Sequence, residues 1–165
     1  MALHDTCSDR IFDVFVQSGP AAALGALPGS GGSRETWIRG AALGALGRYG
    51  RARSALEGLA ADRGVHGSLA ASTLASHLRQ LGRHGDAREF DERALATAER
   101  LGDGGGAPGV DTPADALFDA RLGLAADAVG LADVPAARSW LAAAGDDRAL
   151  WRRDVRLGWV GTEIA

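Results

Sequence analysis

One short pattern occurs three times in this 165-residue sequence and constrains the fold more than any other feature. Its copies cover residues 46–53, 81–88 and 131–138 and read LGRYGRAR, LGRHGDAR and LADVPAAR. The first two copies are 35 residues apart, and the second and third are 50 apart, with a Gly-rich stretch in the longer interval. Self-similarity at a period of about 20–50 residues is typical of arrays in which each unit packs on its neighbours. The sequence therefore predicts a repeat architecture.

The apolar residues between these copies have helical spacing. Leu74, Leu78 and Leu81 recur at intervals of three or four residues and share one helical face. Runs that alternate as a strand would are almost absent. Thr112, followed by a proline and an acid three residues on, predicts a helix start, and Ser68 is a candidate cap. We expect an all-α chain with helices near 6–18, 33–47, 50–63, 68–82, 85–102, 113–131, 135–144 and from 147 to the end.

The repeated Leu-Gly-x-aromatic-x-x-Ala turn resembles the tetratricopeptide repeat (TPR). Gly47 and Gly82 would each end the first helix of a hairpin. A small alanine follows each turn, where two helices would cross closely: Ala52, Ala87 and Ala137. The resemblance covers about residues 34–165. The third copy departs from the family pattern, because it contains a proline and lacks the glycine, and the proline that usually closes each repeat is missing.

The resemblance implies an all-α fold, an α-solenoid of antiparallel helical hairpins with about seven to eight helices. It would comprise three repeats plus a terminal capping helix. Residues 1–32 would form an N-terminal helix and a Gly/Pro-rich linker. Residues 33–165 would form the TPR-like repeat domain, with a flexible loop at 103–111.

Arrays of this family leave a concave groove that is lined by the first helix of each hairpin. Residues of this sequence at the family's groove positions include Arg34, Trp37, Ser72, Ser76, Arg79, Gln80, Asp119, Leu122, Arg152 and Trp159. Tryptophan and arginine dominate binding hot spots, so this set predicts a groove that grips a partner segment. The alternative for Trp37 and Trp159 is a packing role inside the array, because large aromatic residues are usually mostly buried.

Composition and motifs predict neither catalysis nor a bound cofactor. The formal net charge of −3 gives no general attraction to nucleic acid or to an anionic membrane. The only cysteine, Cys7, cannot form an intramolecular disulfide, and with His4 it supplies two ligands where a closed zinc site needs four. No phosphate-binding loop, dinucleotide fingerprint or nucleophile elbow occurs. We therefore expect no catalytic residue, no cofactor, no metal, no nucleic acid and no membrane contact.

Three hypotheses for function remain at this point. The leading one is a non-enzymatic module that binds a peptide or partner helix in the concave groove. The runner-up is a regulatory or sensory helical domain that binds a small ligand, of the kind associated with bacterial transcription regulators. A third is self-association as a homodimer through the exposed end of the stack. The sequence has no apparent signal peptide and no apolar run long enough to cross a bilayer, so we expect a cytoplasmic location.

Overall fold

A computed structural model describes residues 14, 15, 17–102 and 111–145 of the chain, and this part is helical, without β-strands. The α-helices with described bounds are α2 (Pro20–Ala26), α3 (Ser33–Ala45), α4 (Tyr49–Leu56), α5 (Val65–Gln80), α6 (His84–Leu101), α7 (Pro113–Gly130) and α8 (Val134–Ala144), and a short 3₁₀ helix, η1 (Leu59–Ala61), follows α4. The expected all-α class is confirmed. Most of the helix expected over 6–18, and all of the helix expected beyond 147, lie outside the described residues.

Three helices differ from the sequence-based expectation. Helix α4 ends at Leu56 instead of near residue 63, and η1 occupies part of the remainder. Helix α2 was not expected; it begins with Pro20 at its first turn and is too short to show apolar periodicity. Helix α5 begins at Val65, three residues before the expected start, with Gly64 as its N-cap. Ser68 is therefore not a cap. Its hydroxyl donates a hydrogen bond of 2.8 Å to the carbonyl of Ala94 and links α5 to α6 inside the protein.

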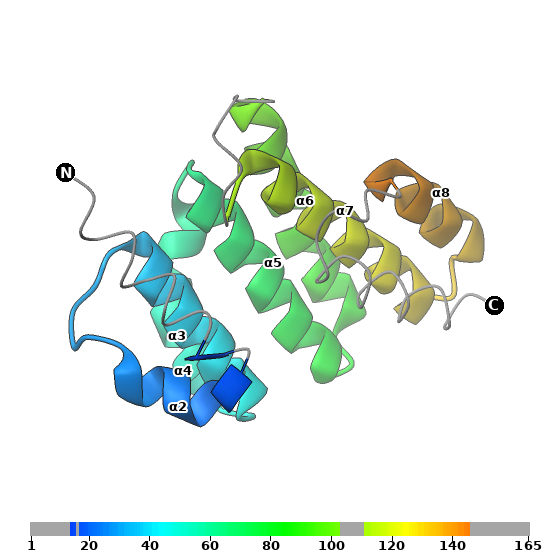
Figure 1. Cartoon of the computed structure of the whole chain (residues 1–165). Helices are drawn as coiled ribbons and strands as arrows, with labels where there is room; N and C mark the ends of the chain where they lie inside the picture. The colour runs from blue at the N-terminus through cyan, green and yellow to red at the C-terminus, as the bar shows by residue number, and fades with distance from the viewer. Residues whose placement is uncertain (1–13, 16, 103–110, 146–165) are drawn as a thin grey trace.

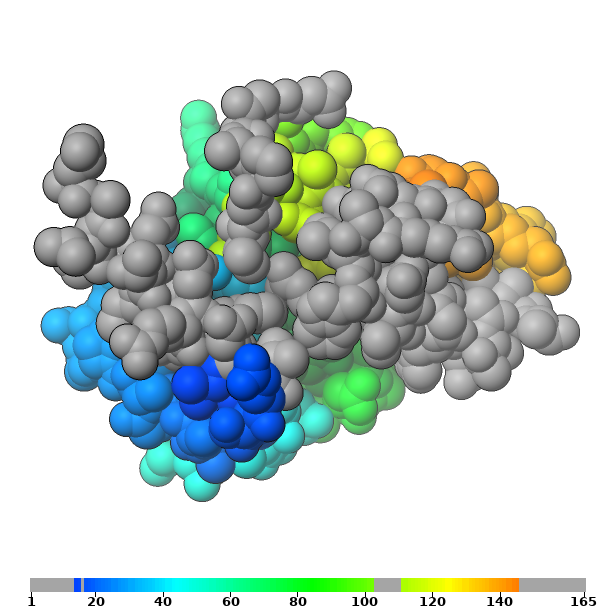
Figure 2. Space-filling model, viewed as in Figure 1, coloured from blue at the N-terminus to red at the C-terminus, as the bar shows by residue number. Residues whose placement is uncertain are grey.

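The helices pack mainly on their neighbours in the chain. The pairs α3–α4, α5–α6 and α7–α8 are in contact, and α5 also packs against α3 and against α7 (Figure 1). Helix α2 lies against α3 at one end, whereas α8, at the other end of the described residues, lies against α7 (Figures 1 and 2). Helix α5 is therefore the central element of the fold.

Three turns between sequential helices have the same backbone geometry. Gly47, Gly82 and Ala132 occupy equivalent positions and have positive φ angles of 71°, 72° and 60°. In each turn, the next residue donates its N–H to a carbonyl five residues back, at 2.8–2.9 Å: Arg48 to Leu43, Arg83 to Leu78 and Asp133 to Ala128. This is the Schellman ending of a helix. The three sequence copies are thus also three copies of one structural turn.

Ala132 is the strained member of this set, because a side chain disfavours the left-handed region. We expect Ala132→Gly to raise the free energy of unfolding by about 1 kcal/mol. The matched control is Gly82→Ala, which creates the same strain in the second turn and should lower it by about the same amount. Urea denaturation of both variants measures these changes. A loss of stability in Ala132→Gly would contradict the equivalence of the turns.

The core is built from small side chains at the helix crossings. Ala52, Ala87 and Ala137 have no exposed surface, as their repeat positions predict. One apolar cluster joins α3, α4, η1, α5, α6 and the start of α7. A second joins α7 to α8 around Phe118 and Leu122. Alanine and glycine at these crossings let the helix axes approach closely.

Candidate functional site

The structure uses several of the expected groove residues for internal contacts. Trp37 is only 5% exposed, and its Nε1 donates a hydrogen bond of 3.0 Å to the hydroxyl of Thr73. Leu122 and Ser72 are also buried. Ser76 and Asp119 are half-buried, and Gln80 is exposed. Arg152 and Trp159 lie outside the described residues. Trp37 therefore has the packing role, whereas partner binding by the other residues stays a prediction.

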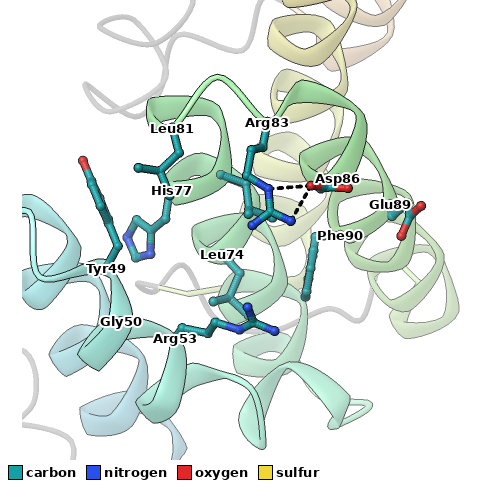
Figure 3. A pocket seen from close by; sticks show the side chains of 11 residues that line it. Tyr49, Gly50, Arg53, Leu74, His77, Leu81, Arg83, Asp86, Glu89 and Phe90 are labelled. Carbon is teal, nitrogen blue, oxygen red and sulfur yellow. Dashed lines mark hydrogen bonds and ion pairs between the residues drawn. The ribbon is translucent and has the colours of Figure 1, made fainter.

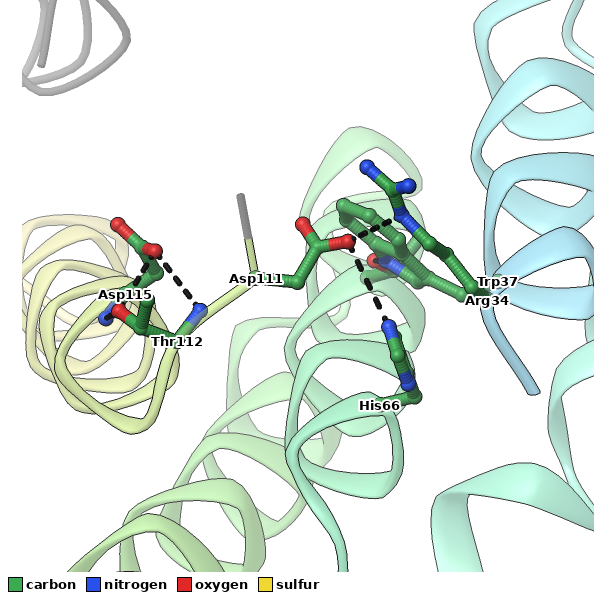
Figure 4. A network of polar contacts seen from close by, with 7 residues as sticks. Arg34, Trp37, His66, Asp111, Thr112 and Asp115 are labelled. Atoms are coloured by element: carbon green, nitrogen blue, oxygen red, sulfur yellow. Dashed lines mark hydrogen bonds and ion pairs between the residues drawn. The ribbon is translucent and has the colours of Figure 1, made fainter. Parts of the chain in front are cut away.

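Arg34 joins α3 to Asp111, which lies two residues before the first residue of α7. Its Nε lies 2.6 Å from Oδ2 of Asp111, whose side chain is 2% exposed. His66 of α5 points at the same oxygen, with its Nε2 3.5 Å away (Figure 4). Burial alone raises the pKa of Asp111, but His66 and Arg34 together outweigh it, so this pKa is lowered. Next along the chain, Thr112 and Asp115 form the expected capping box of α7.

Arg79 connects three helices in the protein interior. Its Nη1 forms ion pairs with Asp91 of α6 and with Oδ1 of Asp127 of α7, the latter at 2.9 Å. Both aspartate side chains are fully buried, and that of Arg79 is 13% exposed. The second oxygen of each carboxyl group has no hydrogen-bond partner in the described structure. The cluster thus combines one guanidinium with two buried carboxyl groups.

This imbalance determines how the cluster titrates. Burial raises the pKa of Asp91 well above its usual value, and the nearby Asp127 raises it further, while Arg79 opposes both effects. The pKa of Asp127 is also raised by burial, against the pull of Arg79. A single guanidinium cannot compensate two carboxylates in a site with little solvent, so the cluster favours retention of a proton.

The raised pKa of Asp91 predicts how the stability of the protein depends on pH. A carboxyl group whose pKa is raised in the folded state contributes most to the stability of that state at pH values below its pKa in the unfolded chain, about 3.9. This contribution is lost as the pH rises through the pKa of the folded state. Asp91→Asn keeps an oxygen for Arg79 and leaves one carboxylate for one guanidinium. We expect this variant to be at least as stable as the wild type at neutral pH, with a weaker decline above about pH 4. Urea unfolding across pH checks it, and an unchanged decline would contradict it.

An open groove lies on another part of the molecule, between α4 and α6, with α5 as its floor. It has a volume of about 370 Å³. Its lining (Figure 3) consists of Tyr49, Gly50, Arg53, Leu74, His77, Leu78, Leu81, Arg83, Asp86, Glu89 and Phe90. The floor is mainly apolar, and the charged side chains belong to the two lips. Such a surface can hold apolar anchors and orient them by charge.

His77 of α5 is the buried polar group of this groove. It is 9% exposed, its Nδ1 has no hydrogen-bond partner in the described structure, and its ring lies 5.5 Å from that of Tyr49 between centroids. Burial, and then the charge of Arg79, lower its pKa. His77 is thus neutral at physiological pH, so the floor carries no charge.

The sequence contains a signal for the buried cluster. The 35-residue register aligns Asp91 with Leu56, which has no exposed surface. A carboxyl group in the position of a core leucine indicates a buried charge that needs a partner. The groove has no comparable signal, since its lining alternates between ordinary core and surface residues.

No group of His, Cys, Asp and Glu that could hold a metal ion occurs among residues 14, 15, 17–102 and 111–145. Within the same residues, no helix combines the length and the apolar character needed to cross a membrane. No family model matches the sequence, and comparisons with curated proteins and with solved structures give no significant match.

Proposed function

We propose that this chain is a TPR-like stack of three helical hairpins that acts as a non-enzymatic interaction module and binds a segment of a partner protein. Three observations support the stack: the turns are equivalent, the alanines at the crossings are fully buried, and α5 packs between α3 and α7. The groove between α4 and α6 supports the binding role, because it leaves apolar side chains open to solvent.

This groove is a better candidate binding site for a partner than the concave-face residues expected from the TPR resemblance. Trp37 and Arg79 of that face already bind other parts of the same chain. In the groove, by contrast, Leu81 keeps 53% of its surface exposed. The half-buried ring of Phe90 lines the same groove, and an exposed leucine together with such a ring is the kind of apolar anchor that partner segments cover.

Selection from a peptide-display library against the full chain tests the proposed function. We expect enrichment of apolar-anchored peptides, and bound peptide should slow hydrogen exchange in α4, α5 and α6. Failure to enrich any peptide would refute the interaction module. If the enriched peptides protect only the concave face, the chain is still an interaction module, but its binding site is the concave face and not this groove.

A small-ligand sensor is the second candidate, and the size of the groove favours it. A volume of about 370 Å³ lies within the range of small-molecule pockets, about 300–1,000 Å³. A thermal-shift screen with metabolites separates the two functions. A shift of several degrees with one compound, and no peptide enrichment, would favour the sensor.

A further inference from the structure

We infer that the natural occupant of the groove between α4 and α6 is an amphipathic α-helix of a partner protein, with acidic side chains along one flank and basic side chains along the other. This inference rests on the proposed function and adds the conformation and the charge pattern of the partner segment. It is carried by the chemistry of the floor and by the unequal charges of the two lips.

The floor favours a helix over an extended peptide. Apart from the ring of His77, the floor consists of leucine side chains (Leu74, Leu78 and Leu81), which offer no hydrogen-bonding groups. Helix α5 runs without interruption from Val65 to Gln80, so its backbone groups are used within the helix. An extended peptide would place its own N–H and C=O groups on this floor without partners, which is costly. A helix satisfies its backbone internally and presents only side chains.

The lips carry opposite net charge. Among the lining residues, the α4 side carries one charge, that of Arg53, which also pairs with Glu57 outside the lining. The α6 side carries Asp86 and Glu89, with Arg83 compensating only the first, at 2.6 Å.

Arg53 and Glu89 lie on opposite sides of the groove (Figure 3). A helix with one acidic and one basic flank complements both lips and is held in one direction.

Leu81 offers the contact that a test can remove without disturbing the fold. It is 53% exposed and lines the groove. The equivalent residue of the third turn, Leu131, is 46% exposed and does not line it. Substitution of either leucine by aspartate changes an exposed turn residue in the same way, and only one of the two changes lies in the proposed site.

The probes are synthetic peptides of about 20 residues, a length at which helices form in water. All have the same leucine stripe; one has a glutamate flank and a lysine flank, one has glutamate on both flanks, and one has lysine on both. Against the full chain, we expect the mixed-flank peptide to bind tightest and to become helical. Leu81→Asp should weaken it about ten-fold or more, whereas Leu131→Asp should change binding less than about two-fold.

Two further variants test the charge pattern and the helical conformation of the peptide separately. Arg53→Glu should remove the preference for the mixed-flank peptide, and a proline at the centre of that peptide should abolish its binding. The inference is overturned if the three peptides bind equally, if the proline peptide binds as well, if Leu81→Asp has no effect, or if none of them binds. Peptide display would still succeed with extended or differently charged peptides, so failure here is distinct from failure of the proposed function.

Discussion

Replacement of Arg79 by methionine is expected to lower the free energy of unfolding by about 3–5 kcal/mol at neutral pH. Methionine fills a similar volume but leaves the carboxyl groups of Asp91 and Asp127 buried without the guanidinium that pairs with both in the described part of the chain. The cost comes from these uncompensated charges more than from the lost contacts. The matched control is Gln80→Met, at the exposed neighbour of Arg79, which should change stability by less than about 0.5 kcal/mol.

The pH dependence of this loss identifies its cause. Arg79 lowers the pKa of both carboxyl groups, so its removal raises them further. Protonation then relieves the buried charge, and the loss should be smaller near about pH 5 than at neutral pH. Adding Asp91→Asn to Arg79→Met should recover part of the loss at neutral pH. Equal losses at both pH values would show that packing, not charge, dominates at Arg79.

The turns were the most predictable part of the structure, because the chemistry that specifies them is local. Gly47 and Gly82 end helices through a backbone conformation that glycine adopts without strain. The register of the copies then places the third turn at Ala132, although no glycine marks it. Short helices without apolar periodicity are harder to predict: α2 contributes the buried Ala23, and its sequence shows only a proline and alanines.

The environment of the predicted site residues was not predictable from spacing alone. Arg79 occupies a position that the TPR resemblance assigned to the groove, but successive residues of a helix point in different directions, so neighbouring positions can face a groove or the interior. Its partners Asp91 and Asp127 lie 12 and 48 residues away and come from two other helices. Whether an arginine faces a groove or an aspartate pair depends on these crossings, which a period of three or four residues does not encode.

The groove exists because of the space between α4 and α6. Its lips belong to α4 and α6, both of which pack on α5. The sequence shows that Tyr49 and His84 occupy equivalent positions, but not that space remains beside Tyr49. His84, in contrast, lies so close to Gly130 of α7 that a Cβ there would stand 2.2 Å from its Nδ1. Equivalent residues thus border an open groove beside α4 and a closed contact between α6 and α7.

Gly40→Ala is expected to lower the free energy of unfolding by about 2 kcal/mol. A Cβ on Gly40 would lie 2.3–2.6 Å from three side-chain carbon atoms of Leu56, which is fully buried and cannot move aside. Overpacking of this kind typically costs about 1–3 kcal/mol, and alanine recovers up to about 1 kcal/mol through its helix propensity. Chemical denaturation measures the net change, which reports on the contact between α3 and α4.

A control and a double variant show whether the clash with Leu56 causes the loss of stability in Gly40→Ala. Gly85 lies in α6 with nothing within 4 Å of an added Cβ, so Gly85→Ala should be neutral or stabilising by up to about 1 kcal/mol. Leu56→Ala alone removes a fully buried side chain and is itself destabilising. In the Leu56→Ala variant, however, Gly40→Ala should lower the free energy of unfolding only slightly, because the clashing atoms are gone. The coupling energy of this double-mutant cycle measures the contact between residues 40 and 56. If Gly40→Ala is as harmless as Gly85→Ala in the wild-type chain, then α3 and α4 do not pack as one close hairpin, and the proposed stack loses its first repeat.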